Sequence, residues 1–424
     1  MKKPALLFLA YRIPFPPNKG DKIRSFNLLK SLARDYRIYL GAFVDDSEDW
    51  QYEAELRKYC AEVFLLGIQN RQKYRTFTAF FKNEALSLPY YRHTRLKSWV
   101  DEKIQTEQLT RVFVYSSAMA QYVQGPAYQD MHRIIDFVDV DSEKWREYSR
   151  RRNWPMKWLY RREADRMLHF DRVIAAEFDA SIFVSAHEAA VFKELAPESK
   201  QHVSFINNGV DSHYFSAEHE SSNPYPSDSQ VLVFTGAMDY WANVDAVTWF
   251  AEKVFPQVQH QIPTAYFYIV GARPSEKVKK LAVNKHIHVT GAVKDIRPYL
   301  AHAKVAVAPM RIARGVQNKV LEAMAMAKPV VATSAAMEGI PSVAGQPICD
   351  HEKDFIEACV RLLNEGDQRE LGTKGRQNVL QEFNWDQNLL KLEELLGDRS
   401  AQPGISTENN KTLDEAMSVG EVLS

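Results

Sequence analysis

Short apolar runs rich in branched and aromatic residues alternate with amphipathic stretches along most of the chain. This alternation predicts parallel sheets covered by helices, because a crossover helix normally follows each buried strand. In the first half we expect strands at 4–10, 37–44, 62–66, 111–115, 133–138, 181–185 and 203–206, and helices at 22–34, 49–60 and around 156–178. In the second half we expect strands at 231–235, 266–270, 287–290, 304–309 and 329–333, and helices at 244–260, 296–302 and 317–327.

The length of 424 residues suits two domains of roughly 200 residues each. A polar stretch rich in Ser and Pro at 216–229 interrupts the alternation and is the best candidate linker. We therefore expect a Rossmann-like domain at 1–216, a second at 217–383, a helix at 384–397 that returns toward the first domain, and a disordered tail at 398–424. Two such sheets in tandem imply a cleft for a ligand that both domains contact.

Charge and cysteine content indicate which ligands and which cellular compartment suit the protein. Residues 1–200 carry 33 Lys and Arg against 27 Asp and Glu, which leaves 21 against 27 in the remainder of a chain with no net charge. A basic first half suits an anionic surface or a phosphate-bearing ligand, although it also fits ordinary solvated surface. The three cysteines, Cys60, Cys349 and Cys359, have no metal-binding spacing, and their odd number argues against a secreted disulfide framework. We expect a reducing, cytoplasmic compartment.

The stretch from Pro309 to Thr333 carries the most informative chemistry. An expected strand runs through a glycine-bearing loop directly into a helix, whose free backbone N–H groups form an anion site. Cationic side chains in the same place suit a diphosphate. Glu322 follows one turn later, where its carboxylate can accept two hydrogen bonds from a ribose, although it could also simply face solvent. The expected anion ligands are Arg311, Arg314, Gly315, Val316, Gln317, Asn318 and Lys319.

Several segments resemble a known family. Leu321-Glu-Ala-Met-Ala325 with Pro329-Val-Val-Ala-Thr333, Ile206-Asn-Asn-Gly-Val-Asp211 and Gly291-Ala-Val-Lys-Asp-Ile-Arg-Pro-Tyr-Leu300 are similar to the family 4 glycosyltransferases, and the resemblance spans roughly residues 5–395. It implies the GT-B fold, an α/β architecture with two Rossmann-like domains facing a cleft. The segments 11–24 and 135–145 resemble the sugar transferases of bacterial exosortase and exopolysaccharide systems, which implies a role in polysaccharide assembly.

The resemblance also implies a reaction. A nucleotide-diphosphate sugar would bind the second domain, an acceptor the first, and the sugar would be transferred with retention of configuration and without a metal or other cofactor. The family's donor motif of two Glu residues places its second Glu on Glu322 and its first on Arg314. Either Arg314 has become a phosphate or carboxylate ligand, or the donor chemistry is altered or lost. The loop after the expected strand 231–235 contains Gly236 but lacks the usual cation, so charge compensation would fall on Arg311, Arg314 and Lys319.

In the first domain, the loop at 16–21 precedes a helix, where the family brings a glycine loop against the donor phosphates. Gly20 and Arg24 would bind the donor there, unless this is an ordinary loop followed by a surface arginine. Asp139 ends an expected strand and is the candidate acceptor-side catalytic group. With Asp141 it also spells Asp-x-Asp, a metal motif of an unrelated transferase fold, but the expected two-sheet layout argues against that fold. We expect no metal site.

Basic residues interleave with Trp and Tyr at 144–166 and again at 71–99. This pattern suits an anionic membrane interface, or alternatively a solvated helix with core aromatics. No apolar run approaches the roughly 18 residues of a membrane span, and nothing indicates nucleic-acid binding. We therefore expect a glycosyltransferase acting on a polyprenyl-linked or polysaccharide acceptor, peripheral contact with the inner membrane face, and salt-sensitive binding to anionic liposomes. The alternatives are a non-catalytic nucleotide-sugar binder or a sugar-nucleotide epimerase.

Overall fold

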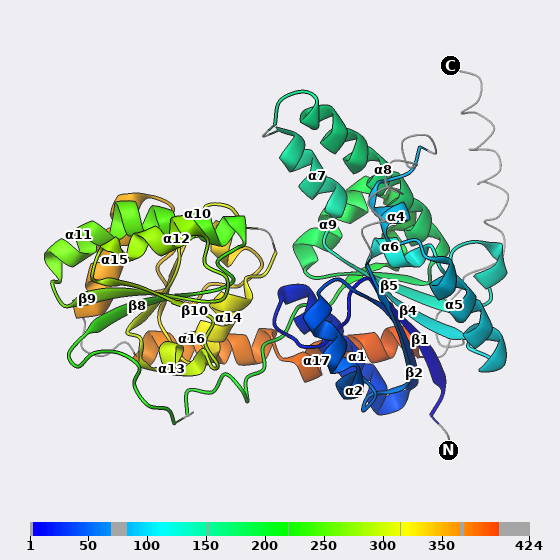
Figure 1. Cartoon of the computed structure of the whole chain (residues 1–424), viewed down its shortest axis with the longest axis horizontal. Coiled ribbons are helices and arrows are strands. Elements are labelled where there is room, and N and C mark those ends of the chain that lie inside the picture. Colours follow the sequence, from blue (N-terminus) through cyan, green and yellow to red (C-terminus); the bar gives the residue numbers. More distant parts are fainter. Residues whose placement is uncertain are drawn as a thin grey trace.

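A computed structural model describes residues 3–68, 83–150, 152–218, 220–313, 315–364 and 369–397. It contains two α/β domains, each built on a parallel sheet (Figure 1). The predicted pair of parallel sheets is therefore confirmed. Three predicted features lie wholly or partly outside the described residues. They are the tail at 398–424, Arg314, and residues 71–82 of the basic and aromatic stretch at 71–99.

The first sheet has seven strands in the order β3-β2-β1-β4-β5-β6-β7. Every pairing is parallel, so the carboxyl ends of the strands meet at one edge. The chain starts in the middle of this sheet and builds outward in both directions, which creates a switch point beside β1 where ligands bind in open sheets. The strands are β1 (Ala5–Ala10), β2 (Arg37–Val44), β3 (Cys60–Gly67), β4 (Arg111–Tyr115), β5 (His132–Val138), β6 (Ala180–Phe183) and β7 (Val203–Phe205).

The second sheet has five strands in the order β10-β9-β8-β11-β12, again all parallel. Apart from the edge strand β10, its strands are nearly continuous apolar runs, as expected for a sheet that helices cover on both faces. Their bounds are β8 (Gln230–Thr235), β9 (Ala265–Val270), β10 (Ile287–Gly291), β11 (Val305–Ala308) and β12 (Val330–Ala332).

Helices cover both sheets (Figure 1). In the first domain they are α1 (Gly20–Asp35), α2 (Glu53–Leu56), α4 (Ser87–Tyr90), α5 (Thr94–Thr106), α6 (Ser117–Ala120), α7 (Asp141–Arg150), α8 (Met156–Glu177) and α9 (Ala186–Leu195), with 3₁₀ turns η1 (Ser47–Tyr52), η2 (Pro126–Tyr128) and η3 (Pro197–His202). In the second they are α10 (Trp241–Trp249), α11 (Phe255–Gln261), α12 (Glu276–Lys279), α13 (Arg297–His302), α14 (Asn318–Ala325), α15 (Glu352–Asn364) and α16 (Arg369–Glu382), with η4 (Phe250–Val254), η5 (Lys280–Val283) and η6 (Ala335–Met337).

The last described helix, α17 (Trp385–Leu396), packs against the first domain rather than the second. Its apolar side chains join the core beneath β1, and it lies beside α1 in Figure 1. A Cβ on Gly209 would lie 2.5 Å from Cγ of Trp385, so glycine is needed where the interdomain segment passes this helix. The apolar residues of α17 in this core are Trp385, Leu389, Leu392, Leu395 and Leu396.

Two expected helices differ from the structure. The helix expected at 244–260 is divided by a π-helical turn, η4. Pro256 at the start of α11 lacks a backbone N–H and its ring crowds the preceding turn, which the wider turn accommodates. The helix expected at 49–60 is instead a 3₁₀ turn followed by the short α2. There Asp46 caps the turn through the backbone N–H of Glu48.

Candidate functional site

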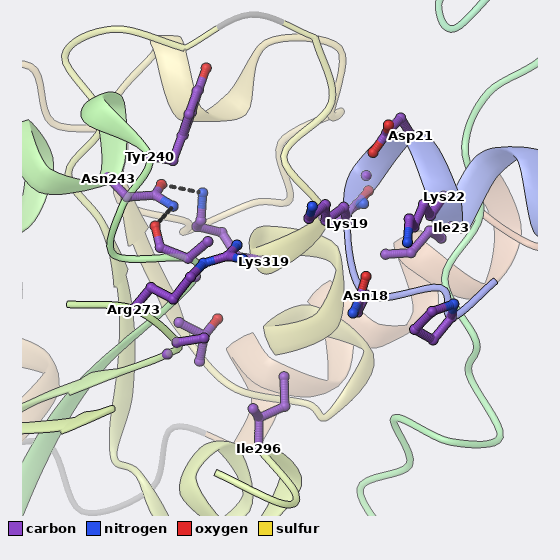
Figure 2. A pocket seen from close by; sticks show the side chains of 18 of the residues that line it. Asn18, Lys19, Asp21, Lys22, Ile23, Tyr240, Asn243, Arg273, Ile296 and Lys319 are labelled. Carbon is purple, nitrogen blue, oxygen red and sulfur yellow. Dashed lines mark hydrogen bonds between the residues drawn. The ribbon is translucent and has the colours of Figure 1, made fainter. Parts of the chain in front are cut away.

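A cavity of about 1040 Å³ lies between the two domains. The second domain contributes the carboxyl ends of β8 and β9 and the first turns of α14, while the first domain contributes the loop that enters α1 and part of η1. Figure 2 shows the loop and first turn of α1 facing the second domain across this space. The predicted donor residues in its lining are Gly20, Gly236, Val316, Gln317, Asn318, Lys319 and Glu322.

Two glycines shape the floor of this cavity. Gly236 and Gly271 end adjacent strands with φ angles of +155° and +159°. A Cβ on Gly271 would lie 1.7 Å from the carbonyl oxygen of Gly236, so the two backbones can touch only without a side chain there. A Cβ on Gly236 would crowd Nδ2 of Asn243 at 2.8 Å. Both glycines line the cavity, and neither places a side chain in it.

Lys319 and Glu322 stand on the cavity wall, one turn apart on α14. Nζ of Lys319 donates to Oδ1 of Asn243 at 3.1 Å and to Oε1 of Gln317 at 3.3 Å. Burial lowers the pKa of Lys319 to about 8, although Glu322 opposes the shift. Burial also raises the pKa of Glu322 to about 7, again with partial compensation by Lys319. Both groups are poorly solvated, so a ligand with phosphate and hydroxyl groups would complete their interactions.

Sequence reasoning missed four further cations that line the cavity, Arg12, Lys19, Lys22 and Arg273. Arg273 follows β9 and pairs with Asp239, with 2.7 Å between Nε and Oδ2. Lys19 precedes α1 and lines the opposite wall. In Figure 2, Arg273 and Lys319 lie on the second-domain side and Lys19 lies across from them. The available signal was the glycine at the end of strand 266–270, which marks a ligand-binding strand end with a cation two residues later.

Arg311, a predicted donor ligand, lies outside the lining of this cavity. Its Nη2 is 2.6 Å from Oδ1 of Asp245, and its guanidinium lies 5.9 Å from the ring centroid of Trp249. It does not line the cavity, so a donor contact would require it to leave this ion pair. Arg314 lies outside the described residues, and the donor-binding roles of both arginines stay predictions.

A second cavity of about 520 Å³ opens in the first domain beside the first. Gly20, Asp21, Val316 and Asn318 line both cavities, so a ligand in one can approach a ligand in the other. Oδ1 of Asn318 is buried there without a hydrogen-bond partner among the described residues. This unsatisfied acceptor at the boundary is suited to a hydroxyl group.

Asp139 lines the second cavity at the end of β5. Its Oδ2 is 2.7 Å from Nζ of Lys144, which also contacts Oδ1 of Asp141 at 3.1 Å. The neighbouring carboxylates raise the pKa of Lys144, so this lysine stays charged. The Asp-x-Asp pair thus holds a lysine, and the described residues contain no cluster of three His, Cys, Asp or Glu side chains placed for a metal. Gly315, with φ of +63°, brings the second domain against Asp139: a Cβ there would lie 3.4 Å from Oδ1.

Arg24 is fully buried and lines the second cavity, not the first. Its Nε donates to Oδ2 of Asp136 at 2.7 Å, and Nη1 donates to the carbonyl of Ile206 and to Oδ1 of Asn208. Its Nη2 is buried without a hydrogen-bond partner among the described residues. The arginine therefore joins α1 to the end of β5 and the interdomain segment, and its predicted donor contact stays a prediction.

None of the helices in the described part of the chain is both long and apolar enough to cross a membrane. Three exposed aromatic residues of the first domain, Tyr148, Trp154 and Trp158, lie on the α7–α8 hairpin.

Part of the chain matches a protein family, and its fold is similar to that of solved structures. Residues 229–365 match the family model described as glycosyl transferases group 1. No curated protein matches the chain in sequence. HepE from Anabaena, solved in complex with UDP and glucose, is similar with a TM-score of 0.63 and 13% identity over 92% of this chain and 99% of HepE.

Two other solved structures are similar over nearly their whole length. Sucrose-phosphate synthase from Thermosynechococcus elongatus has a TM-score of 0.65 and 16% identity, over 93% of this chain and 98% of its own. WaaG, a glycosyltransferase involved in lipopolysaccharide biosynthesis, has a TM-score of 0.62 and 14% identity, over 93% and 100%. With its two parallel-sheet domains on either side of a cavity, the chain has the GT-B fold, and its second domain is similar to the group 1 glycosyl transferases.

Proposed function

We propose that the chain is a glycosyltransferase that moves a sugar from a nucleotide-diphosphate sugar to a glycan or lipid-linked acceptor. The observation that carries this proposal is the joint placement of Lys319, Glu322 and the start of α14 on one wall of the interdomain cavity. The match of residues 229–365 to group 1 glycosyl transferases supports it. The complexes of HepE with UDP and with UDP-glucose make a UDP-sugar the first donor to test.

In this proposal the leaving diphosphate lies against the N-terminus of α14. Its charge is compensated by Lys319, by Arg273 and by the oriented backbone N–H groups. Such preorganised charges stabilise a developing anion far better in a partly closed cavity than in water. Glu322 accepts hydrogen bonds from the ribose hydroxyls. Lys319, Arg273 and Lys19 supply this positive charge, so the reaction proceeds without a metal. By resemblance to family 4 it retains the anomeric configuration.

The acceptor binds in the second cavity, which borders the donor cavity at Asn318. Asp139 orients the attacking hydroxyl group, and the ion pair with Lys144 positions the Asp139 carboxylate. The resemblance of 11–24 and 135–145 to exopolysaccharide-associated transferases supports a polysaccharide or polyprenyl-linked acceptor in bacterial polysaccharide assembly, and so does the similarity to WaaG. The reaction takes place in the cytoplasm.

The test is a panel of UDP-, GDP-, ADP- and TDP-sugars, screened by thermal shift and by slow hydrolysis on the wild type and on Glu322→Ala. We expect one nucleotide to raise the melting temperature of the wild type, to have little effect on Glu322→Ala, and to release its sugar. If no nucleotide stabilises the wild type, the donor-site assignment is wrong and the similarity extends to the fold alone.

Arg314 favours one alternative, a nucleotide-sugar binder without transferase activity, because an arginine stands where the resembling family has a glutamate. Binding without sugar release in the same panel would support this alternative. Conversion of one UDP-sugar to its epimer without an acceptor would instead indicate an epimerase.

A further inference from the structure

Large apolar side chains are exposed at the tip of the helical hairpin formed by α7 and α8. We define the hairpin tip as residues 148–162. Four of its side chains are exposed although they are aromatic or aliphatic, at 82% for Trp154, 55% for Trp158, 39% for Met156 and 36% for Tyr148. Every described residue from 152 to 158 is exposed. Exposed apolar residues gathered in this way mark an interaction surface rather than ordinary surface.

The charge of the hairpin tip is of one sign. Residues 148–162 contain six Lys and Arg and no Asp or Glu, in a chain whose total charge is zero. Four of these cations are exposed beside the tryptophans, namely Arg150, Arg152, Lys157 and Arg161. Aromatic rings that reach head-group depth, flanked by cations, match an anionic lipid surface.

Trp154 takes no part in the aromatic cluster inside the hairpin. That cluster consists of Trp145 and Tyr148 of α7 and Tyr160 of α8, with ring centroids 5.5 Å apart for Trp145–Tyr160 and 5.9 Å for Trp145–Tyr148. Figure 1 shows the two helices projecting together from the first domain, away from its sheet. Trp154 lies at the turn between them, where removal of its ring leaves this aromatic cluster intact.

The same hairpin leads to the second cavity. Asp141, Lys144, Trp145 and Tyr148 of α7 line that cavity. The helix has 10 residues, which at 1.5 Å per residue gives a length of about 15 Å. Because Tyr148 belongs both to the hairpin tip and to this lining, a surface bound at the tip lies within one helix length of the proposed acceptor site.

We propose that the hairpin tip docks on an anionic lipid bilayer and thereby presents the second cavity to acceptors anchored in that bilayer. The docking surface rests on the exposed tryptophans and cations alone. The delivery of a lipid-linked acceptor rests, in addition, on the proposed function. Trp154 and Trp158 insert among the head groups, and the exposed cations bind the lipid phosphates.

The experiment is flotation of the full chain with vesicles of phosphatidylcholine, with and without phosphatidylglycerol. We expect binding only to the anionic vesicles and release at high salt, because salt screens the cations. Trp154→Ala/Trp158→Ala should lower the partition coefficient on the order of tenfold or more, since it removes most of the inserted apolar area. Arg150→Glu/Lys157→Glu should lower it at least about 25-fold, because each cation near such a surface contributes a factor of about five.

Matched controls lie away from the hairpin. Trp50→Ala removes a tryptophan that is 42% exposed, and Lys253→Glu/Lys285→Glu makes the same change in net charge on the second domain. Both should float like the wild type. Equal binding to neutral and anionic vesicles, or hairpin variants that float like the wild type, would overturn the proposal. A wild-type dimer in sedimentation that Trp154→Ala/Trp158→Ala dissociates would overturn it as well, because the tip would then be a contact between copies.

Nucleotide binding, measured by thermal shift without vesicles, separates this inference from the proposed function. If the hairpin variants bind nucleotide normally but no longer float, docking is supported. If the wild type floats but binds no nucleotide, the lipid surface stands while the transferase function fails. If it binds nucleotide but does not float, docking alone fails.

Discussion

Lys319 and Glu322 lie one turn apart on α14, and burial shifts their pKa values toward each other, to about 8 for the lysine and about 7 for the glutamate. Each charged side chain therefore costs free energy in the empty cavity, and their mutual attraction compensates only in part. A diphosphate beside Lys319 and hydroxyl groups beside Glu322 would supply the missing interactions. Under the proposed function, these two positions would trade protein stability for ligand affinity.

Glu322→Gln should stabilise the empty protein and weaken nucleotide binding. The folded-state pKa of Glu322 is raised from 4.5 to about 7, so the folded protein binds more protons than the unfolded chain in that window. The stability of the wild type therefore falls as pH rises from 4.5 to 7, and the penalty is fully present above 7. At pH 8 the variant should gain on the order of 1–3 kcal/mol.

The measurement is urea unfolding of both proteins at pH 5 and pH 8, with nucleotide titration alongside. Comparing the variant with the wild type at each pH cancels the contributions of titrating groups that do not interact with Glu322. If the difference in stability between variant and wild type is the same at pH 5 and pH 8, the raised pKa of the Glu322 carboxyl is contradicted.

The affinity for nucleoside diphosphate should fall as pH rises above about 8. The pKa of Lys319 is lowered to about 8 in the empty cavity, and a bound diphosphate raises it, so binding above pH 8 requires uptake of a proton. The dissociation constant should rise up to about tenfold between pH 8 and pH 9.5. Calorimetry in two buffers of different ionisation enthalpy measures the proton uptake. Lys319→Arg serves as the control, because an arginine remains charged and should show no uptake in this range.

Arg273→Ala should lower the turnover of the donor about 100-fold, by analogy with the loss of one preorganised donor at a developing anion. Arg311→Ala should have a small effect, because Arg311 pairs with Asp245 outside the cavity lining. Steady-state rates of sugar release compare the two variants directly. The reverse order of effects would show that Arg311 leaves its ion pair to bind the donor, as the sequence predicts.

Asp139→Asn should impair use of the acceptor without impairing nucleotide binding. Asp139 lines the second cavity and pairs with Lys144, and it does not line the first. We expect kcat/KM for the acceptor to fall about 10²–10³-fold, typical of a lost acid–base group, with an unchanged nucleotide dissociation constant. A variant that loses nucleotide affinity to the same extent would place Asp139 at the donor instead.

The sequence predicted most of the framework. The strands at 37–44 and 111–115 match the structure residue for residue, because long β-rich apolar runs bounded by polar turns leave little choice of conformation. The positions of Gly236, Lys319 and Glu322 on the cavity wall were also predictable. Lys319 and Glu322 belong to one strand-loop-helix unit and Gly236 follows another strand, and the geometry of each unit is local in sequence.

The sequence by itself determined the two parallel sheets, the strand ends that face the cavity, and the positions of Lys319 and Glu322 on the cavity wall. Only the tertiary structure decided which long side chains enter that cavity. Arg311 pairs with Asp245, 66 residues earlier, while Arg273 and Lys19 reach the cavity from different domains. Arg24 is buried against Asp136, 112 residues away, where the sequence predicted a donor contact. A long cationic side chain extends toward a nearby carboxylate or into open space. The residues that surround it belong to segments distant in the sequence, which come together only in the folded chain.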